Sequence, residues 1–181
     1  MYQTIHINKQ SIYLAMAYPP FSFFILTCLI ISTSHAAPVD DVCTKTTNPP
    51  LCIAALGGPE SHKDNLVGLA EIGFQTAGMA AVKFVNLFTT FASSPRVSAN
   101  AKANAVKCGK LYDRVFKGLI TPAHEAARVG RWADVVSPVR QIVVGIDTCE
   151  MYFNGNSPVH EDSRIARVAA EAIVVIAGFK S

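Results

Sequence analysis

The chain has few charged residues and lacks the motifs of the common enzyme classes. Only 16% of its 181 residues are charged. It has no Gly-x-Ser-x-Gly, no phosphate-binding glycine loop and no His-Glu-x-x-His, so no nucleophile elbow, nucleotide site or zinc-protease site is predicted. It also has no Cys-x-x-Cys, and no histidine lies at ligand spacing from a cysteine, which argues against zinc. We therefore expect no catalytic residues, no cofactor and no metal.

The chain also lacks a strong excess of charge of either sign. The formal net charge is +3, which is too small to indicate a nucleic-acid partner. There is no Asn-x-Ser/Thr sequence, so N-glycosylation is not expected. No stretch alternates polar and apolar residues with period two, and we predict no strands.

The first 36 residues have the pattern of a secretory signal peptide. Residues 1–20 contain one basic residue and no acidic one, and Phe21 to Ile31 form an apolar run that is too short to span a bilayer. Small residues then lead to Ala36, after which we place cleavage. Translation can start at Met1 or at Met16. The prediction is a secreted chain with no membrane anchor after the leader is removed.

Cysteine usage agrees with secretion. Cys28 lies in the leader, and four cysteines remain, an even number that favours two disulfides. Four cysteines permit three pairings, and nearness in sequence favours Cys43 with Cys52, which leaves Cys108 with Cys149.

The segment from residue 37 to 60 is predicted to be a helical hairpin. Asn48-Pro49-Pro50 interrupts it, because proline cannot continue a helix and restricts the residue before it. A disulfide between Cys43 and Cys52 would hold together a hairpin with little apolar surface of its own. We hypothesise that the hairpin packs against the rest of the chain or against a neighbouring copy.

Residues 61–181 show four stretches of helical periodicity, in which apolar residues recur at steps of three and four. We predict a first helix capped at Ser61 and a second that opens at Ser93-Ser94-Pro95, with a kink or short break at Pro122. The third begins at Arg131-Trp132. The fourth is capped by Asp162 or Ser163 and buries a face that ends at Phe179.

Four long amphipathic helices with short connections predict an all-α fold, an antiparallel up-and-down four-helix bundle that follows the hairpin. Cys108 and Cys149 fall on the inward faces of the second and third helices, which supports their pairing.

Two features offer contacts to a partner. Trp132 follows Gly130-Arg131 at the start of a helix, where it can anchor a partner at an exposed loop or, more commonly, seal the end of the bundle. Basic residues recur along the second helix, at Lys102, Lys107, Lys110, Arg114 and Lys117. A solvated face is the default interpretation, although a protein partner can also recognise such a face.

Several segments resemble the plant invertase and pectin methylesterase inhibitors. The opening Val42-Cys43-x-Lys45-Thr46-x-Asn48-Pro49-x-Leu51-Cys52-x-x-Ala55-Leu56 is similar to the family's N-terminal hairpin, and Ser61-His-Lys-Asp64-Asn-Leu66-x-Gly68-Leu69 to the start of its first bundle helix. Cys108-x-x-x-Tyr112, Gly130-x-aromatic and Thr148-Cys149-Glu150-x-x-Phe153 follow in the family's order. The resemblance covers essentially all of the chain after the leader.

The resemblance implies a non-catalytic inhibitor with disulfides Cys43–Cys52 and Cys108–Cys149 that forms a one-to-one complex with its target. Invertase inhibitors insert a Pro-Lys-Phe segment after the second bundle helix, and here that place reads Val129-Gly130-Arg131-Trp132-Ala133. It is closer to the Gly-Asp-Tyr of the methylesterase inhibitors, with Arg131 in place of the acid and Trp132 in place of the tyrosine.

The preferred prediction is therefore a pectin methylesterase inhibitor that occludes the substrate cleft. Its candidate target-binding residues are Arg131, Trp132, Arg114, Arg140 and Asp147. The alternatives are an acid invertase inhibitor, an allergen-like family member and, more distantly, a secreted helical module that binds a small apolar ligand. We expect a monomer or weak homodimer located in the cell wall, with the vacuole as an alternative.

Overall fold

The structure is a computed structural model that describes residues 38–57 and 65–181. The predicted leader, its cleavage after Ala36 and the predicted cap at Ser61 lie outside the described residues. The described residues belong to one compact unit. Within these two ranges, no helix is long and apolar enough to cross a membrane.

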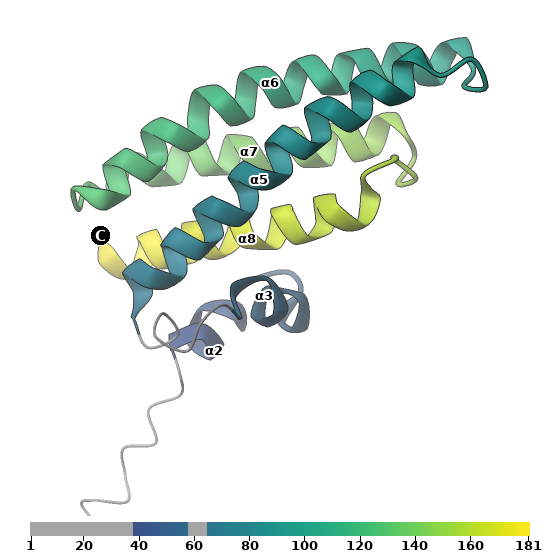
Figure 1. The fold of residues 1–181 in the computed structure, drawn as a ribbon. Coiled ribbons are helices and arrows are strands. Elements are labelled where there is room, and N and C mark those ends of the chain that lie inside the picture. The colour runs from purple at the N-terminus through teal and green to yellow at the C-terminus, as the bar shows by residue number, and fades with distance from the viewer. Residues whose placement is uncertain (1–37, 58–64) are drawn as a thin grey trace, which may run out of the picture. The chain divides into compact units, whose positions relative to one another are not determined.

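Two short helices and four long ones make up this part of the chain (Figure 1). The short helices are α2 (Pro38–Cys43) and α3 (Pro49–Leu56). The long helices are α5 (Leu66–Ser93), α6 (Ala99–Arg128), α7 (Ala133–Tyr152) and α8 (His160–Lys180). No strand occurs in the described ranges, and the all-α prediction is confirmed.

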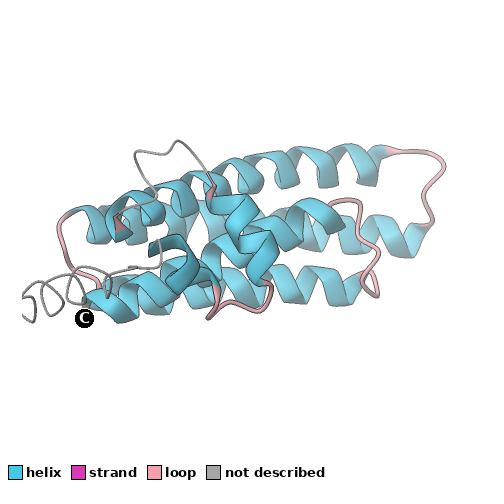
Figure 2. Cartoon of the chain, turned by 90° about the horizontal axis from the view of Figure 1, so that it is seen from below, coloured by secondary structure: helices cyan, strands magenta, loops and turns pink. Residues whose placement is uncertain are grey.

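The four long helices form the predicted bundle. Each packs against the next in sequence, and α8 returns to pack against α5, which closes the bundle (Figure 2). Because the connections are short, consecutive helices run antiparallel.

The two short helices form the predicted hairpin, which packs on the bundle against α8 and α5. Asn48 caps α3, since its side-chain oxygen accepts a hydrogen bond from the Leu51 amide at 3.2 Å, and two prolines occupy the first turn. Val42 and Leu56 are fully buried in the same core as the bundle residues. Of the two hypotheses for the hairpin, the structure shows packing against its own bundle.

Both predicted disulfides are present. Cys43 bonds Cys52 across the hairpin, and Cys108 of α6 bonds Cys149 of α7. All four cysteines are fully buried. The first bond therefore fixes the hairpin and the second joins two neighbouring helices inside the core.

The structure shows the cap of α5 and differs from two predictions for α6. Asn65 caps α5, accepting a hydrogen bond from the Gly68 amide at 2.6 Å. Ser98 caps α6, and Pro95 lies in the turn before it, because the chain needs residues 94–98 to reverse direction. The helix α6 continues through Pro122, so the predicted short break is absent.

The start of α8 also differs from the prediction. The helix begins at His160, and the preceding Val159 provides no side-chain cap. Ser163 lies inside the first turn, where its hydroxyl donates to Glu150 rather than capping the helix. At the other end, Phe179 is 42% exposed instead of buried, although the Lys45 ammonium lies 3.9 Å from the centre of its ring.

Helices α6 and α7 both end in a hydrogen-bonded reversal with a residue in the left-handed conformation. After α6, Gly130 has φ of 77° and the Arg131 amide donates to the Ala126 carbonyl at 2.8 Å. After α7, Asn154 has φ of 53° and the Gly155 amide donates to the Glu150 carbonyl at 2.9 Å. These are Schellman motifs, which end a helix within one turn.

The core combines aromatic packing with a close helix approach. Tyr112 packs between Phe84 and Phe88, with ring centres 5.0 and 5.7 Å away. At the contact between α5 and α8, a β-carbon at Gly73 would lie 2.9 Å from the Ile173 side chain. A side chain larger than hydrogen would therefore push these two helices apart.

Candidate functional site

The candidate site is the outward face of α7, which has a groove on each side. The α6–α7 groove, about 640 Å³, is lined by Leu111, Ala133, Val136, Ser137, Arg140, Gln141, Val144, Gly145 and Thr148. The α7–α8 groove, about 410 Å³, is lined by Lys45, Thr47, Arg140, Val143, Val144, Glu171, Val174 and Val175. Arg140 and Val144 line both grooves, so they form a ridge between them.

The α7 ridge, defined by Arg140 and Val144, combines a cation with an exposed apolar side chain. The two residues are four apart and therefore neighbours on one helix face. Val144 is 64% exposed, and Arg140 is also exposed. No ion pair involves Arg140 among the residues that the structure describes. An arginine beside an apolar side chain, with a groove on either side, is a typical anchor for a protein partner.

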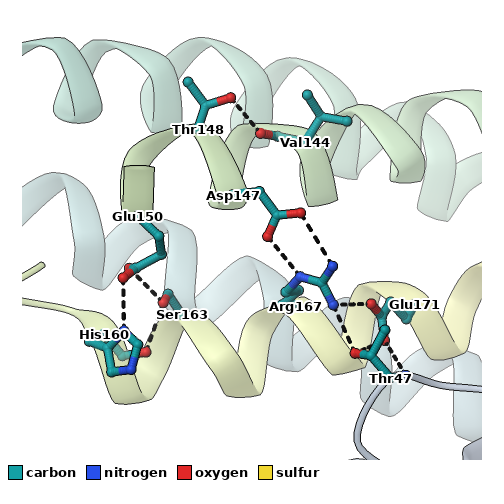
Figure 3. A network of polar contacts seen from close by, with 9 residues as sticks. All are labelled: Thr47, Val144, Asp147, Thr148, Glu150, His160, Ser163, Arg167 and Glu171. Carbon is teal, nitrogen blue, oxygen red and sulfur yellow. Dashed lines mark hydrogen bonds and ion pairs between the residues drawn. The ribbon is translucent and has the colours of Figure 1, made fainter. Parts of the chain in front are cut away.

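A polar network holds the hairpin beside this face (Figure 3). Arg167 of α8 donates from Nε to Asp147 of α7 at 2.7 Å and from Nη1 to the Thr47 hydroxyl at 2.8 Å, and it also pairs with Glu171. The amide and hydroxyl of Thr47 both donate to Glu171, at 2.9 and 2.8 Å. The network therefore fixes the hairpin loop next to the α7–α8 groove.

The two carboxylates of this network stabilise the charged form of Arg167. The hydrogen bond that Arg167 donates to Asp147, together with the negative charges of Asp147 and Glu171, raises the pKa of Arg167 against the opposing effect of burial. The arginine side chain is 29% exposed. Charge-assisted hydrogen bonds from a partly buried arginine constrain geometry more than exposed ion pairs do.

A second polar cluster closes the turn between α7 and α8. Glu150 accepts hydrogen bonds from Ser157 at 2.6 Å and Ser163 at 2.8 Å, and contacts His160 Nδ1 at 2.8 Å. Burial raises the pKa of Glu150, but these three hydrogen bonds and the charge of His160 outweigh it, so the pKa lies below its ordinary value. The cluster joins the last turn of α7 to the first turn of α8.

Of the two interpretations of Trp132, the structure shows the one in which the side chain seals the end of the bundle. Its side chain is only 7% exposed and belongs to the core cluster, so it seals the end of the bundle and is not available as an anchor. The reason is that the Schellman turn at Gly130 lets α7 begin at once, which turns the indole inward. The neighbouring Arg131 is exposed and pairs with Asp134 at 3.5 Å.

The remaining predicted contacts lie on the outer surfaces of two helices. Arg114 of α6 and Arg140 of α7 are exposed. Asp147 is about half exposed, but its carboxylate is held by Arg167. Of the five predicted residues, the structure therefore leaves Arg114, Arg131 and Arg140 with exposed charges and places Asp147 in a structural network.

Sequence reasoning missed Val144 on this face and the network beside it, formed by Thr47, Arg167 and Glu171. Val144 could have been found, because it is a valine on the polar side of an amphipathic helix. The partnership of Thr47 with Arg167 could not, since the two residues are 120 positions apart and nothing in a local pattern joins them.

The polar clusters in the described part of the chain join helices to one another. In the described ranges, no group of three or more metal-ligating side chains comes together. The histidine–carboxylate pairs are part of helix contacts, since His124 bonds Glu71 between α6 and α5 while stacking on Phe74, 4.9 Å between ring centres. What the bundle offers is a rigid, two-disulfide scaffold with an exposed helix face.

Comparison with known proteins identifies the family. The sequence profile of the plant invertase/pectin methylesterase inhibitors matches residues 37–175, and the chain belongs to this family. Its members are inhibitors and not enzymes, they act on pectin methylesterase or invertase, and they are extracellular. The protein is accordingly an inhibitor of one of these two enzymes.

Solved structures share the fold. A mutant form A of a pectin methylesterase inhibitor from Arabidopsis superposes with a TM-score of 0.70 at 20% identity, over 79% of this chain and 97% of that one. A pectin methylesterase inhibitor from Arabidopsis thaliana superposes with a TM-score of 0.59, also at 20% identity, over 79% and 95%. No curated protein sequence gives a significant match.

Proposed function

We propose that this protein inhibits pectin methylesterase by forming a one-to-one complex in which the faces of α6 and α7 cover the enzyme's substrate cleft. The mechanism is steric, because a bundle laid over the cleft prevents the pectin chain from entering. The observation that carries the choice of target is the closed turn between α6 and α7.

That turn has nothing to insert into an active site. Invertase inhibitors of the family use a Pro-Lys-Phe segment at this place, and here the segment is absent. The aromatic residue present, Trp132, is buried, and the Arg131 side chain is drawn towards Asp134. Contact by a helix face therefore fits this chain better than insertion of a loop.

The α7 ridge provides the centre of the proposed contact. Val144 is exposed between two grooves that can receive apolar side chains from the enzyme, and Arg140 can pair with a carboxylate there. Arg114 and Arg131 lie at the periphery of this face, and Asp147 supports it through Arg167. Interfacial charge of this kind makes binding dependent on salt.

The location follows from the same proposal. A pectin methylesterase acts in the cell wall, so the inhibitor must be exported, and we propose that residues 1–36 serve as the signal peptide.

The deciding experiment adds the disulfide-intact protein to a purified pectin methylesterase and, separately, to an acid invertase. We expect stoichiometric loss of ester hydrolysis with sucrose cleavage unchanged. Loss of sucrose cleavage alone would refute the choice of target, and no effect on either enzyme would refute inhibition of both. A heat-unfolded and reduced sample serves as the control for non-specific effects.

A further inference from the structure

One face of α6 carries a row of cations, of which the proposed inhibition uses only Arg114. The α6 basic row is defined here as Lys107, Lys110, Arg114, Lys117 and Arg128. Successive members are three, four, three and eleven residues apart, so they share one side of the helix. All five are exposed.

The positive charge of the protein is concentrated on this helix. Helix α6 contains six basic residues against two acidic ones, a net charge of +4, while the whole chain carries +3. The rest of the chain is therefore slightly negative. Within the described ranges, the ion pair found on the row joins Lys117 to Asp113 at 2.5 Å.

The length of the row matters for what it can bind. At 1.5 Å per residue, Lys107 and Arg128 are separated by about 30 Å along the helix axis. Four cations lie three or four residues apart from Lys107 to Lys117, and Arg128 follows after a gap in which Glu125 lies on the same side. A row of this length fits an extended chain with repeated negative charges. A single carboxylate or phosphate would use only one or two members.

The chemistry of the row also differs from that of a protein-binding surface. Protein interfaces centre on apolar or aromatic anchors with few lysines, as on the α7 ridge. Among the α6 residues whose exposure the structure describes, the large exposed apolar side chain is Val106, which is 46% exposed and lies beside the row. A surface on which cations outnumber apolar side chains favours a flexible polyanion, whose binding is driven by release of counterions.

We propose that the α6 basic row binds a linear polyuronate, specifically de-esterified pectin. The choice of polymer rests on the proposed function. Pectin methylesterase hydrolyses each methyl ester with water to a carboxylic acid and methanol, and the acid then loses its proton at neutral pH. The neutral substrate thereby becomes a polyanion, and the row retains the inhibitor where the enzyme has already acted.

The test measures binding of the disulfide-intact protein to polygalacturonate by affinity electrophoresis at several salt concentrations. Highly methyl-esterified pectin of equal length is the uncharged comparison. The variant Lys107→Gln/Lys110→Gln/Arg128→Gln removes three charges from the row and leaves Arg114 in place. The matched control, Arg96→Gln/Arg164→Gln/Lys180→Gln, removes three exposed charges from outside α6.

We expect the protein to bind polygalacturonate, with an affinity that falls as salt rises, and to bind the esterified polymer much more weakly. The row variant should bind polygalacturonate about tenfold more weakly at low salt, and the control variant should bind like the wild type. Equal losses in both variants would overturn the proposal, because net charge and not the row would then explain binding. Equal binding of both polymers would overturn it as well.

A parallel measurement separates this proposal from the proposed function. Calorimetric titration of the inhibitor into pectin methylesterase, without pectin, reports the protein complex alone. Normal complex formation without polygalacturonate binding would overturn only the polyuronate site. Polymer binding by the row without any complex would support the site and refute the proposed function. A third result is also possible: the row variant no longer binds pectin methylesterase, and the wild type does not bind polygalacturonate. That result would overturn the polyuronate site and assign the row to contact with an acidic protein surface.

Discussion

At the residue scale, Tyr112 places a hydroxyl group in the core without a hydrogen-bond partner in the described part of the protein. The side chain is fully buried, and burial raises its pKa strongly, with the charges of Glu150 and Asp147 adding to the effect. An unsatisfied buried hydroxyl costs about 1–3 kcal/mol, whereas its aromatic ring packs well.

The first prediction concerns that hydroxyl. Tyr112→Phe removes the unpaired group and keeps the ring, so the free energy of unfolding should stay unchanged or rise by about 1 kcal/mol. Urea unfolding followed by circular dichroism measures it. Tyr112→Leu is the control, since it loses the contacts with Phe84 and Phe88 and should be less stable. A clear loss of stability in Tyr112→Phe would mean that the hydroxyl has a partner.

The second prediction concerns the α7 ridge. Arg140→Ala and Val144→Ala should each weaken inhibition of pectin methylesterase by about tenfold, because each removes a central contact from the proposed interface. Val82→Ala is the matched control, since Val82 is a 56% exposed valine on α5. Inhibition titrations give the affinities, and thermal unfolding checks that the fold is intact. Unchanged inhibition in both ridge variants would move the interface elsewhere.

At the scale of elements, the hairpin depends on two kinds of attachment. Val42 and Leu56 join the common core, and Thr47 bonds Arg167 and Glu171 on α8. Helices of six and eight residues are too short to persist by themselves. The hairpin therefore keeps its place only through contacts with the bundle and its own disulfide.

The third prediction tests the polar attachment. Arg167→Gln removes the ion pairs to Asp147 and Glu171, and should lower the free energy of unfolding by about 1–3 kcal/mol. Hydrogen exchange should increase first at the Thr47 amide. Arg164→Gln is the control, because Arg164 pairs with Glu161 at the surface, and its loss should cost less than about 0.5 kcal/mol. Equal effects of the two changes would contradict a special role for Arg167.

The fourth prediction concerns the junction of α7 and α8. Because the pKa of Glu150 is lowered in the folded state, its contribution to stability is present above its unfolded pKa of about 4.5 and is lost as pH falls through the folded value. Glu150→Gln should therefore be less stable than the wild type at neutral pH, and the difference should shrink below about pH 4. Denaturant unfolding across this range measures it. A difference that stays constant with pH would rule out this titration as the cause.

At the scale of the whole molecule, two disulfides secure different parts of the fold. Their sequence separations are 9 residues for Cys43–Cys52 and 41 for Cys108–Cys149. In the chain-entropy account, a longer loop gives more stabilisation, about 3 and about 4 kcal/mol respectively.

The fifth prediction uses this difference. Replacing Cys108 and Cys149 with alanine should lower the melting temperature of the bundle more than replacing Cys43 and Cys52. Loss of the hairpin bond should mainly increase proteolysis within residues 38–57. Circular dichroism melting and limited proteolysis distinguish the two results. If loss of the hairpin bond instead melts all the helices together, the hairpin is part of the cooperative core.

The sequence by itself determined the helices, the hairpin, both disulfides and the family. These features can be read from short stretches of sequence and from the order of motifs along the chain. Apolar residues at steps of three and four indicate the helices, the prolines after Asn48 indicate the hairpin, and the even number of cysteines indicates the disulfides. Helix ends were less well predicted, because residues such as Ser98 and Ser163 can cap or hydrogen-bond elsewhere, and the choice depends on neighbouring helices.

Only the tertiary structure decided which residues remain available for binding. It buried Trp132, bound Asp147 to Arg167, and left Arg140 and Val144 exposed between two grooves. It also placed the hairpin on α8 through hydrogen bonds between residues that are 120 and 124 positions apart in the sequence. The physical reason is that periodicity fixes which side of a helix is apolar, whereas exposure depends on which other helices cover that side.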